Sequence, residues 1–313
     1  MIGMYSGKSP FSLQPFTAVN PVITAEMVTD IHAGFVADPF MINRQGMWYM
    51  FFEILKEPDN KGVIGLATST DCHEWDYDRV VLEQPFHLSY PMVFQYNEEI
   101  LMIPESHSNY EICIYKADNF PYNWKKYTTL IKGNYSDPTI FIHGKYCFLF
   151  ASDRNDFLHL FWAENIYGPW HAHPKSPIVT FDPERARPGG RVIVAGDSII
   201  RFTQNCKHSY GWDVRAFIVT DITPENYQEK PYSNNPVLQG TGTGTDWNGI
   251  RMHHVDLHQI NKQEWLAVTD GVGRWSEYGL GLFGEKNIVS IGPRVTIKSP
   301  YRKVKRKNEA EIQ

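Results

Sequence analysis

Five similar segments of the chain carry an acidic side chain, or in one case an amide, at corresponding places. The segments begin near Asp38, Pro91, Asp137, Gly189 and Val255, and the residues 14 to 16 positions further on are Glu53, Glu105, Asp153, Gln204 and Asp270. Carboxyl groups crowded in a partly desolvated space take up different pKa values, so that one stays protonated while another is ionised. Cleavage of a glycosidic bond uses such a pair.

A structural role for these acids stays open, because acids at strand ends also form turns and cap backbone amides. Their repetition at matching offsets favours a shared pocket. We therefore expect Asp38, Glu105 and Asp137 to point into one central cavity and to carry the chemistry. The remaining members of the set are assigned to substrate binding: Glu53, Asp153, Gln204 and Asp270.

Basic residues cluster in the fourth and fifth segments. Arg187 and Arg191 flank a Gly-Gly pair, which lets backbone approach a ligand, and guanidinium groups bind carboxylates and phosphates in a fork. We expect both arginines to line or border the cavity, although they could equally neutralise the acids. Tyr90 and three residues of the fifth segment complete the predicted substrate-binding set: His253, His254 and Asp256. Histidines on strands usually satisfy hydrogen bonds, so we predict no cofactor, and a central metal ion remains the alternative.

The elements that must position these residues are short β-strands. Each segment opens with a strand-like run such as FVADPFMI or SDPTIFIH, and a second and a third run follow, as in MWYMFFE and GVIGLATS. Runs rich in Val, Ile, Phe and Tyr, separated by Gly, Asn and Asp, indicate antiparallel strands. The five anchors lie 46 to 66 residues apart, close to the size of a four-stranded blade. The sequence therefore predicts an all-β, five-bladed β-propeller.

The predicted propeller spans residues 1–300 as a single domain, followed by a basic, disordered tail at 301–313. A propeller closes its ring by lending a terminal strand to the far blade. NPVIT, from Asn20, is similar to SPIVT and NPVLQ in the third and fourth blades, so it is one candidate for the closing strand. SIGPRVTIKS, from Ser290, is the other. YGLGLFGE, from Tyr278, is the expected third strand of the last blade.

The composition limits the classes of molecule that the protein is expected to bind. A net charge of −5 disfavours nucleic-acid binding, which needs a basic surface. The four cysteines form no C-x-x-C pair, and no stretch has the length of a membrane span or the pattern of a signal peptide, so we expect a cytoplasmic protein. An aromatic content of 14 %, with 9 Trp and 17 Tyr, suits sugar surfaces. The expected partner is a carbohydrate or sugar phosphate, and the oligomeric state stays open.

The segments that open with Asp38-Pro39 and Asp137-Pro138 resemble the arabinanase, xylosidase and invertase superfamily of five-bladed propellers, which includes furanosidases. FVADPFMI, SYPMVF, PES, ARPGGRV and MHHVDLH together resemble more closely the N-terminal propeller of glucosamine inositolphosphorylceramide transferases and its stand-alone bacterial relatives. The resemblance implies that Asp38 is the general base or nucleophile and that Asp137 orients the substrate or tunes the acid.

The third carboxylate departs from the superfamily pattern. Its hydrolases place an acid Glu at the opening of a later blade, where this chain has RPGGR, so Glu105 or Glu184 would have to substitute. The leading hypothesis is an enzyme that makes or breaks a glycosidic bond. A glycosyltransferase or phosphorylase that uses a phosphorylated donor, a glycan-binding propeller without chemistry, and an assembly platform remain alternatives.

Overall fold

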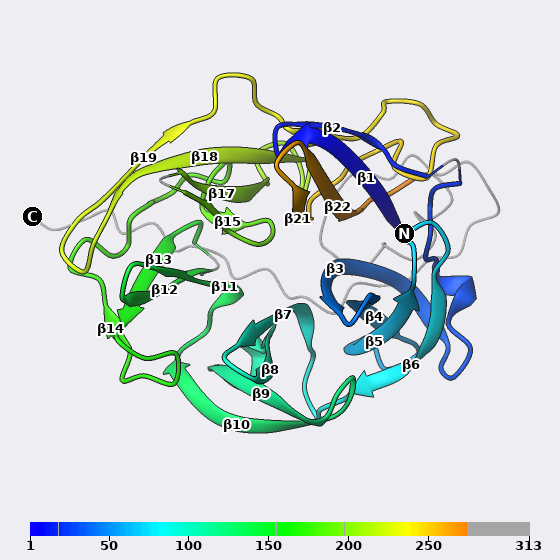
Figure 1. Cartoon of the computed structure of the whole chain (residues 1–313), viewed down its shortest axis with the longest axis horizontal. Helices are drawn as coiled ribbons and strands as arrows, with labels where there is room; N and C mark the ends of the chain where they lie inside the picture. Colours follow the sequence, from blue (N-terminus) through cyan, green and yellow to red (C-terminus); the bar gives the residue numbers. More distant parts are fainter. Residues whose placement is uncertain (18, 154, 197, 274–313) are drawn as a thin grey trace, which may run out of the picture. The chain divides into compact units, whose positions relative to one another are not determined.

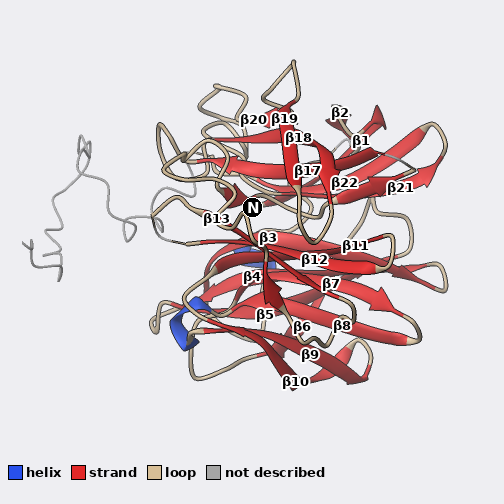
Figure 2. Ribbon diagram, turned by 90° about the vertical axis from the view of Figure 1, so that its left-hand side faces the viewer, coloured by secondary structure: helices blue, strands red, loops and turns tan. Residues whose placement is uncertain are grey.

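The fold is a ring of five antiparallel β-sheets, each forming one blade of a propeller (Figure 1). The computed structural model describes residues 1–273 except 18, 154 and 197. Helical structure in this part is limited to two 3-10 turns, η1 (Ala25–Met27) and η2 (His107–Asn109), and strands with their connecting loops make up the rest (Figure 2). The predicted all-β, five-bladed propeller is confirmed. Positions 274–313, which include the predicted boundary at 300 and the basic tail, lie outside the described residues.

Blades 1 to 3 are four-stranded meanders. Blade 1 contains β3 (Ala33–Arg44), β4 (Met47–Lys56), β5 (Lys61–Ser69) and β6 (Asp76–Leu82). Blade 2 contains β7 (Ser89–Tyr96), β8 (Glu99–Glu105), β9 (Glu111–Asn119) and β10 (Tyr122–Lys132). Blade 3 contains β11 (Ser136–His143), β12 (Tyr146–Ser152), β13 (Leu158–Ala163) and β14 (His171–Ala172). The strand-like runs predicted from the sequence coincide with the first three strands of each blade.

Blade 4 has an interrupted inner strand. β15 (Arg187–Pro188) and β16 (Ile193–Ala195) both pair with β17 (Ser198–Asn205), and β18 (Asp213–Ile222), β19 (Tyr227–Pro231) and β20 (Leu238–Gln239) complete the sheet. At the interruption the Val255 N–H donates to the Gly189 oxygen at 2.9 Å. Gly190 has a φ of +136°, and a Cβ there would lie 1.7 Å from the Val255 oxygen. The Gly-Gly pair therefore serves close packing against blade 5, which is a different use from the predicted approach to a ligand.

Blade 5 closes the ring with strands from the opposite end of the chain. β21 (Val255–Asn261) and β22 (Glu264–Asp270) are followed in the sheet by β1 (Ile2–Ser9) and β2 (Ser12–Pro15). β1 pairs with β22 from Ile2 opposite Asp270 to Gly7 opposite Trp265. Closure from the N-terminal side was one of the two alternatives, but the closing strands precede NPVIT. YGLGLFGE and SIGPRVTIKS lie outside the described residues, and β1 occupies the third place in the blade.

The three NPVIT-like segments lie beside the third strands of their blades and share one contact. Asn20 exchanges two hydrogen bonds of 3.0 Å with the Met4 backbone, and Asn235 makes the same pair with Ala216, at 2.8 and 2.9 Å. Ser176 accepts from the Leu160 N–H at 3.2 Å. Each segment also pairs with the third strand of its blade: Ile23 bridges to Ile2, Val179 bridges to Leu158, and β20, within NPVLQ, pairs with β18. They therefore lie on the outer side of the third strand, as the sequence predicted for the third and fourth blades.

Three inner strands carry an unusual residue at the same place. Asp38, Tyr90 and Asp137 have φ values of 51°, 46° and 52°, and each lies where the register between the inner and second strands shifts. Left-handed backbone is uncommon for residues other than Gly, and Asp and Asn tolerate it better than Tyr. The register shift takes the side chains of Asp38, Tyr90 and Asp137 out of the regular alternation of the sheet. It therefore sets the directions in which these three side chains point.

Apolar side chains of the inner and second strands fill the spaces between blades. Phe40, Leu101 and Leu149 belong to a cluster that joins blades 1 to 3, and Phe202 and Leu257 to one that joins blades 4 and 5. Their burial supplies the main favourable term in folding and fixes the blades around the site. Among the described residues, no helix has both the length and the apolar character needed to cross a lipid bilayer.

Candidate functional site

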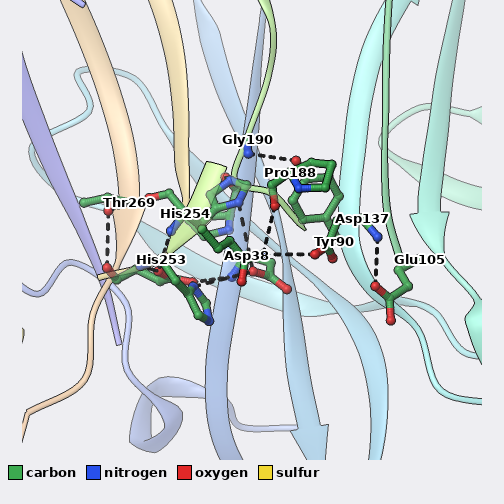
Figure 3. Close-up of polar contacts among 12 residues, drawn as sticks. Asp38, Tyr90, Glu105, Asp137, Pro188, Gly190, His253, His254 and Thr269 are labelled. Atoms are coloured by element: carbon green, nitrogen blue, oxygen red, sulfur yellow. Dashed lines mark hydrogen bonds and ion pairs between the residues drawn. The ribbon is translucent and has the colours of Figure 1, made fainter. Parts of the chain in front are cut away.

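The centre of one end of the ring holds buried carboxylates. Asp38, Glu105 and Asp137 expose 5 %, 3 % and 1 % of their surface, and they come from the inner or second strands of blades 1 to 3 (Figure 3). Buried charges are costly unless paired or hydrogen-bonded, so the partners of each carboxylate show what it can do.

Two carboxylates hold the backbone of the neighbouring blade. Glu105 Oε2 accepts the N–H of Asp137 at 2.9 Å, and Asp270 Oδ2 accepts the N–H of Asp38 at 3.0 Å (Figure 3 shows the first). Burial alone would raise the pKa of Glu105, but the His107 hydrogen bond and the Arg187 charge lower it below its usual range. The pKa of Asp270 is lowered in the same way, against burial, by His253. Both groups are therefore ionised structural acceptors, and Glu105 is poorly suited to be a proton donor.

Asp38 differs from these two. Its Oδ1 atom is buried and has no hydrogen-bond partner within the described part of the chain. Burial, followed by the negative charges of Glu53, Asp270 and Asp137, raises the pKa of Asp38 well above its usual range. Asp38 is therefore the central carboxyl group with an available oxygen and with a strong tendency to hold a proton.

Two histidines lie beside Asp38. His253 Nδ1 is 2.8 Å from Asp270 Oδ2 and 3.9 Å from Asp38 Oδ1. His254 is fully buried, its Nε2 lies 2.9 Å from the Pro39 oxygen, and burial lowers its pKa to about 4. A neutral His254 whose Nε2 carries the proton has a lone pair on Nδ1, which is 4.0 Å from Asp38 Oδ1. Asp38, His253 and Asp270 could hold a metal ion, since one ligand atom of each lies within 4.8 Å of the others.

Arg187 joins this centre to an open cavity. Its Nε donates to Asp137 Oδ2, and its Nη2 is 3.7 Å from Glu105 Oε2. Gln204 Nε2 donates to the same Asp137 oxygen at 2.9 Å. The guanidinium carbon lies 4.9 Å from the centre of the Tyr210 ring. The cavity has a volume of about 330 Å³ and is lined by Ser152, Asp153, Asp156, Ala186, Arg187, Cys206 and Tyr210.

Comparison with known proteins settles the family. A family profile described as the N-terminal part of glucosamine inositolphosphorylceramide transferase 1 matches residues 1–272. The chain belongs to this family. Proteins named glucosamine inositolphosphorylceramide transferase 1 are 34 % identical in Oryza sativa subsp. japonica and 33 % identical in Arabidopsis thaliana, each over 86 % of this chain. The alignment covers 39 % and 38 % of those relatives, so the chain spans well under half of their length.

Solved structures share the fold of this transferase N-terminal family at low sequence identity. A beta-1,2-mannobiose phosphorylase from Listeria innocua has a TM-score of 0.60 at 12 % identity, over 87 % of this chain and 97 % of that one. An alpha-L-arabinofuranosidase from Podospora anserina has a TM-score of 0.56 at 11 % identity, over 82 % and 96 %. These likenesses confirm the propeller fold shared with glycoside hydrolases.

Of the predicted site residues, Asp153 and Arg187 line the cavity, whereas Asp38, Glu105 and Asp137, which were expected to point into it, are not among its lining residues. Ser152, and not Asp153, pairs with Ser136 and so corresponds to Glu53 and Glu105 in the register. Asp153 lines the cavity from its rim, where it accepts from Asn155, Phe157 and His159. Arg191 and Asp256 do not line the cavity. They form a buried pair in which Arg191 Nε lies 2.6 Å from Asp256 Oδ1.

The Tyr90 hydroxyl connects three blades. The Gly190 N–H donates to it at 2.7 Å, and Thr139 Oγ1 lies 2.8 Å away (Figure 3 shows the first bond). Glu53 is also buried, at 3.2 Å from His87 Nε2. Sequence reasoning missed Tyr210 and Asp156, which line the cavity from loops where no strand pattern marks them.

The Tyr90 hydroxyl gives a stability prediction. We expect Tyr90→Phe to lower the free energy of unfolding by about 1–3 kcal/mol, because the buried Gly190 N–H loses its acceptor. Urea unfolding followed by tryptophan fluorescence measures this change. Tyr127→Phe, on a ring that is 58 % exposed, is the control and should leave stability unchanged. Unaltered stability with weakened ligand binding would instead return Tyr90 to its predicted role in substrate binding.

Proposed function

We propose that this chain makes or breaks a glycosidic bond by transfer that involves a phosphorylated sugar, with Asp38 as the group that exchanges the proton. The free Oδ1 of Asp38 beside the Arg187 centre carries this proposal. Hydrolysis by the two-carboxylate route needs one protonated and one ionised carboxyl group that both face the sugar. Glu105 and Asp270 are each engaged with a backbone N–H of the next blade, so neither is available to activate water. When phosphate is the nucleophile or the leaving group, no second carboxylate is needed to activate water.

Arg187 supports the phosphorylated ligand. It lines the cavity, and its Nη1 makes no hydrogen bond to the described residues, while Asp137 fixes the guanidinium through Nε. Arginine binds phosphate oxygens in a fork, and a fixed guanidinium loses little freedom when it does so. Tyr210 stacks on the guanidinium, lines the same cavity and is 39 % exposed as a residue. Arg187 and Tyr210 are therefore the proposed anion-binding and sugar-binding groups.

The names of the curated relatives support a transfer reaction. The curated proteins from rice and Arabidopsis are called transferases, and the fold is also that of a phosphorylase. We extend a transfer reaction from those names to this chain, although it covers only 39 % of the rice protein.

A glycan-binding propeller without chemistry is the second candidate. The residues that line the cavity do not include Asp38, which is 5 % exposed. Binding alone needs Arg187 and Tyr210 and makes no demand on Asp38. Turnover assays on sugar 1-phosphates, nucleotide sugars and disaccharides with inorganic phosphate separate the two candidates, since a binding module releases no product from any of them.

Removal of the Arg187 charge tests the anion site. We expect Arg187→Gln to weaken binding of sugar 1-phosphates about 10- to 100-fold, the equivalent of one charge-assisted hydrogen bond, and to change binding of the unphosphorylated sugars little. Isothermal titration calorimetry measures both. Arg79→Gln, on the outer strand of blade 1, is the matched control. Equal affinity of wild type and Arg187→Gln for every phosphorylated sugar would contradict the proposal. If Arg187→Gln does not fold, Arg187→Lys keeps the charge without the fork and should give a smaller loss.

A further inference from the structure

A strained and exposed aromatic residue stands in the loop between β14 and β15. Phe181 has a φ of 52°, in the left-handed region, and 77 % of its surface is exposed. A bulky residue in this conformation is strained, and the exposed ring recovers little of that cost by burial. Such an arrangement is retained where the ring has a use on the surface.

Backbone contacts place Phe181 beside the cavity. The Asp182 N–H donates to the Asp156 oxygen at 3.3 Å, and the Cys206 N–H donates to the Pro183 oxygen at 2.8 Å. Asp156 and Cys206 both line the cavity. The ring of Phe157, the residue after Asp156, meets Phe181 edge to face, with 4.5 Å between ring centres and planes at 82°. Phe157 therefore holds the Phe181 ring in place beside the cavity, while 77 % of the Phe181 surface stays exposed.

The polar surroundings of this ring favour one kind of ligand. The Asp156 carboxylate makes no hydrogen bond or ion pair within the described residues, and burial is the main cause that raises its pKa. An open aromatic face next to a free carboxylate matches a sugar ring, whose C–H groups cover the aromatic face while its hydroxyls donate to the carboxylate. Two rings are far too small for a stable protein interface.

We infer that Phe181, supported by Phe157 and Asp156, forms a binding subsite for a second sugar ring of the ligand whose first sugar enters the cavity beside Arg187. This inference rests on the proposed function, because it takes the cavity to be a sugar site. It assigns the chain a ligand of at least two sugar rings, with the second one neutral or carrying an amine.

The test compares monosaccharides with disaccharides of the same sugar. The probes are mannose with β-1,2-mannobiose and glucosamine with its β-1,4-linked disaccharide, titrated by calorimetry into the full chain. We expect wild type to bind at least one disaccharide about tenfold more tightly than its monosaccharide. Phe181→Ala should remove this preference and leave monosaccharide affinity unchanged, and Phe181→Trp should keep it. Tyr127→Ala removes an exposed ring from blade 2 and should have no effect.

Each other outcome is decisive. The subsite is overturned if the disaccharide preference persists in Phe181→Ala, or if wild type shows no such preference. In both cases, binding of the monosaccharides would leave the proposed function unaffected. Absence of binding to all four sugars and to their 1-phosphates overturns both. Sedimentation with vesicles of phosphatidylcholine and phosphatidylserine that is lost in Phe181→Ala would identify Phe181 as a membrane contact and also overturn the subsite.

Discussion

Asp38→Asn is expected to lower kcat by about 10²- to 10⁴-fold, the range for loss of a general acid or base, while ligand affinity changes less than about threefold. The substitution keeps the shape of the side chain and removes its titration. It also keeps the backbone, because Asn tolerates the left-handed φ of 51° that Asp38 adopts. The measurement is product release from a sugar 1-phosphate, together with the dissociation constant of the same compound.

The pH profile separates a proton donor from a residue that only positions the ligand. Because the pKa of Asp38 is raised, the protonated acid persists to higher pH than for an ordinary aspartate, and wild-type kcat should fall as pH rises through that value. The residual activity of Asp38→Asn should lack this limb. Asp118→Asn, at the exposed end of β9, is the control. Equal rates for wild type and Asp38→Asn would end the catalytic hypothesis, and unchanged binding without turnover in either protein would favour the glycan-binding candidate.

Arg191→Met is expected to lower the free energy of unfolding by about 3–5 kcal/mol, because the buried Asp256 loses its guanidinium partner and keeps only His258, whose Nε2 lies 2.9 Å from Asp256 Oδ2. Arg191 Nη2 also donates to the backbone oxygens of Met41 and Val93, so that one side chain of blade 4 holds blades 1, 2 and 5. The change is measured by urea unfolding.

A second substitution distinguishes the ion pair from packing. Asp256→Asn removes the partner's charge and keeps an acceptor for the Met41 N–H, which is 2.7 Å from Asp256 Oδ2. We expect Arg191→Met with Asp256→Asn to recover part of the stability lost by Arg191→Met alone. A loss below about 1 kcal/mol in Arg191→Met, with weaker sugar binding, would restore the ligand-binding role that the sequence predicted for Arg191.

The sequence predicted the blades well because each is a local repeat. A run of alternating or continuous apolar residues between turn residues marks a strand wherever it lies, so β4, β8 and β12 could all be found. Ring closure is a contact between distant segments, and the Gly residues at positions 3 and 7 weaken the strand pattern of β1. NPVIT carries the stronger similarity to other blades, so β1 was not among the two candidates for the closing strand.

The sequence predicted where most of the candidate site residues lie better than it predicted what each of them does. Counting along the repeat found Glu53, Glu105 and Asp270, but it failed by one residue at Asp153, where a small change of length reverses the side-chain direction. Composition cannot show which acid meets an N–H of the next blade, and that contact distinguishes Glu105 from Asp38. Tyr210 belongs to a loop whose path is set by packing against His253, at 5.4 Å between ring centres, and no periodic pattern encodes that path.

Closure of the ring by β1 has a consequence for the order of folding. β1 precedes its partner β22 by some 255 residues along the chain, so during synthesis the β1 edge has no partner while the strands between them are made. Pairing between ends so distant in sequence carries a large loop-closure entropy and is slow. Until it forms, Ile2 and Met4, which are fully buried in the native ring, stay exposed beside unpaired backbone groups. We therefore expect folding in the cell to be more efficient when β1 is protected, for example by a chaperone, until blade 5 is complete.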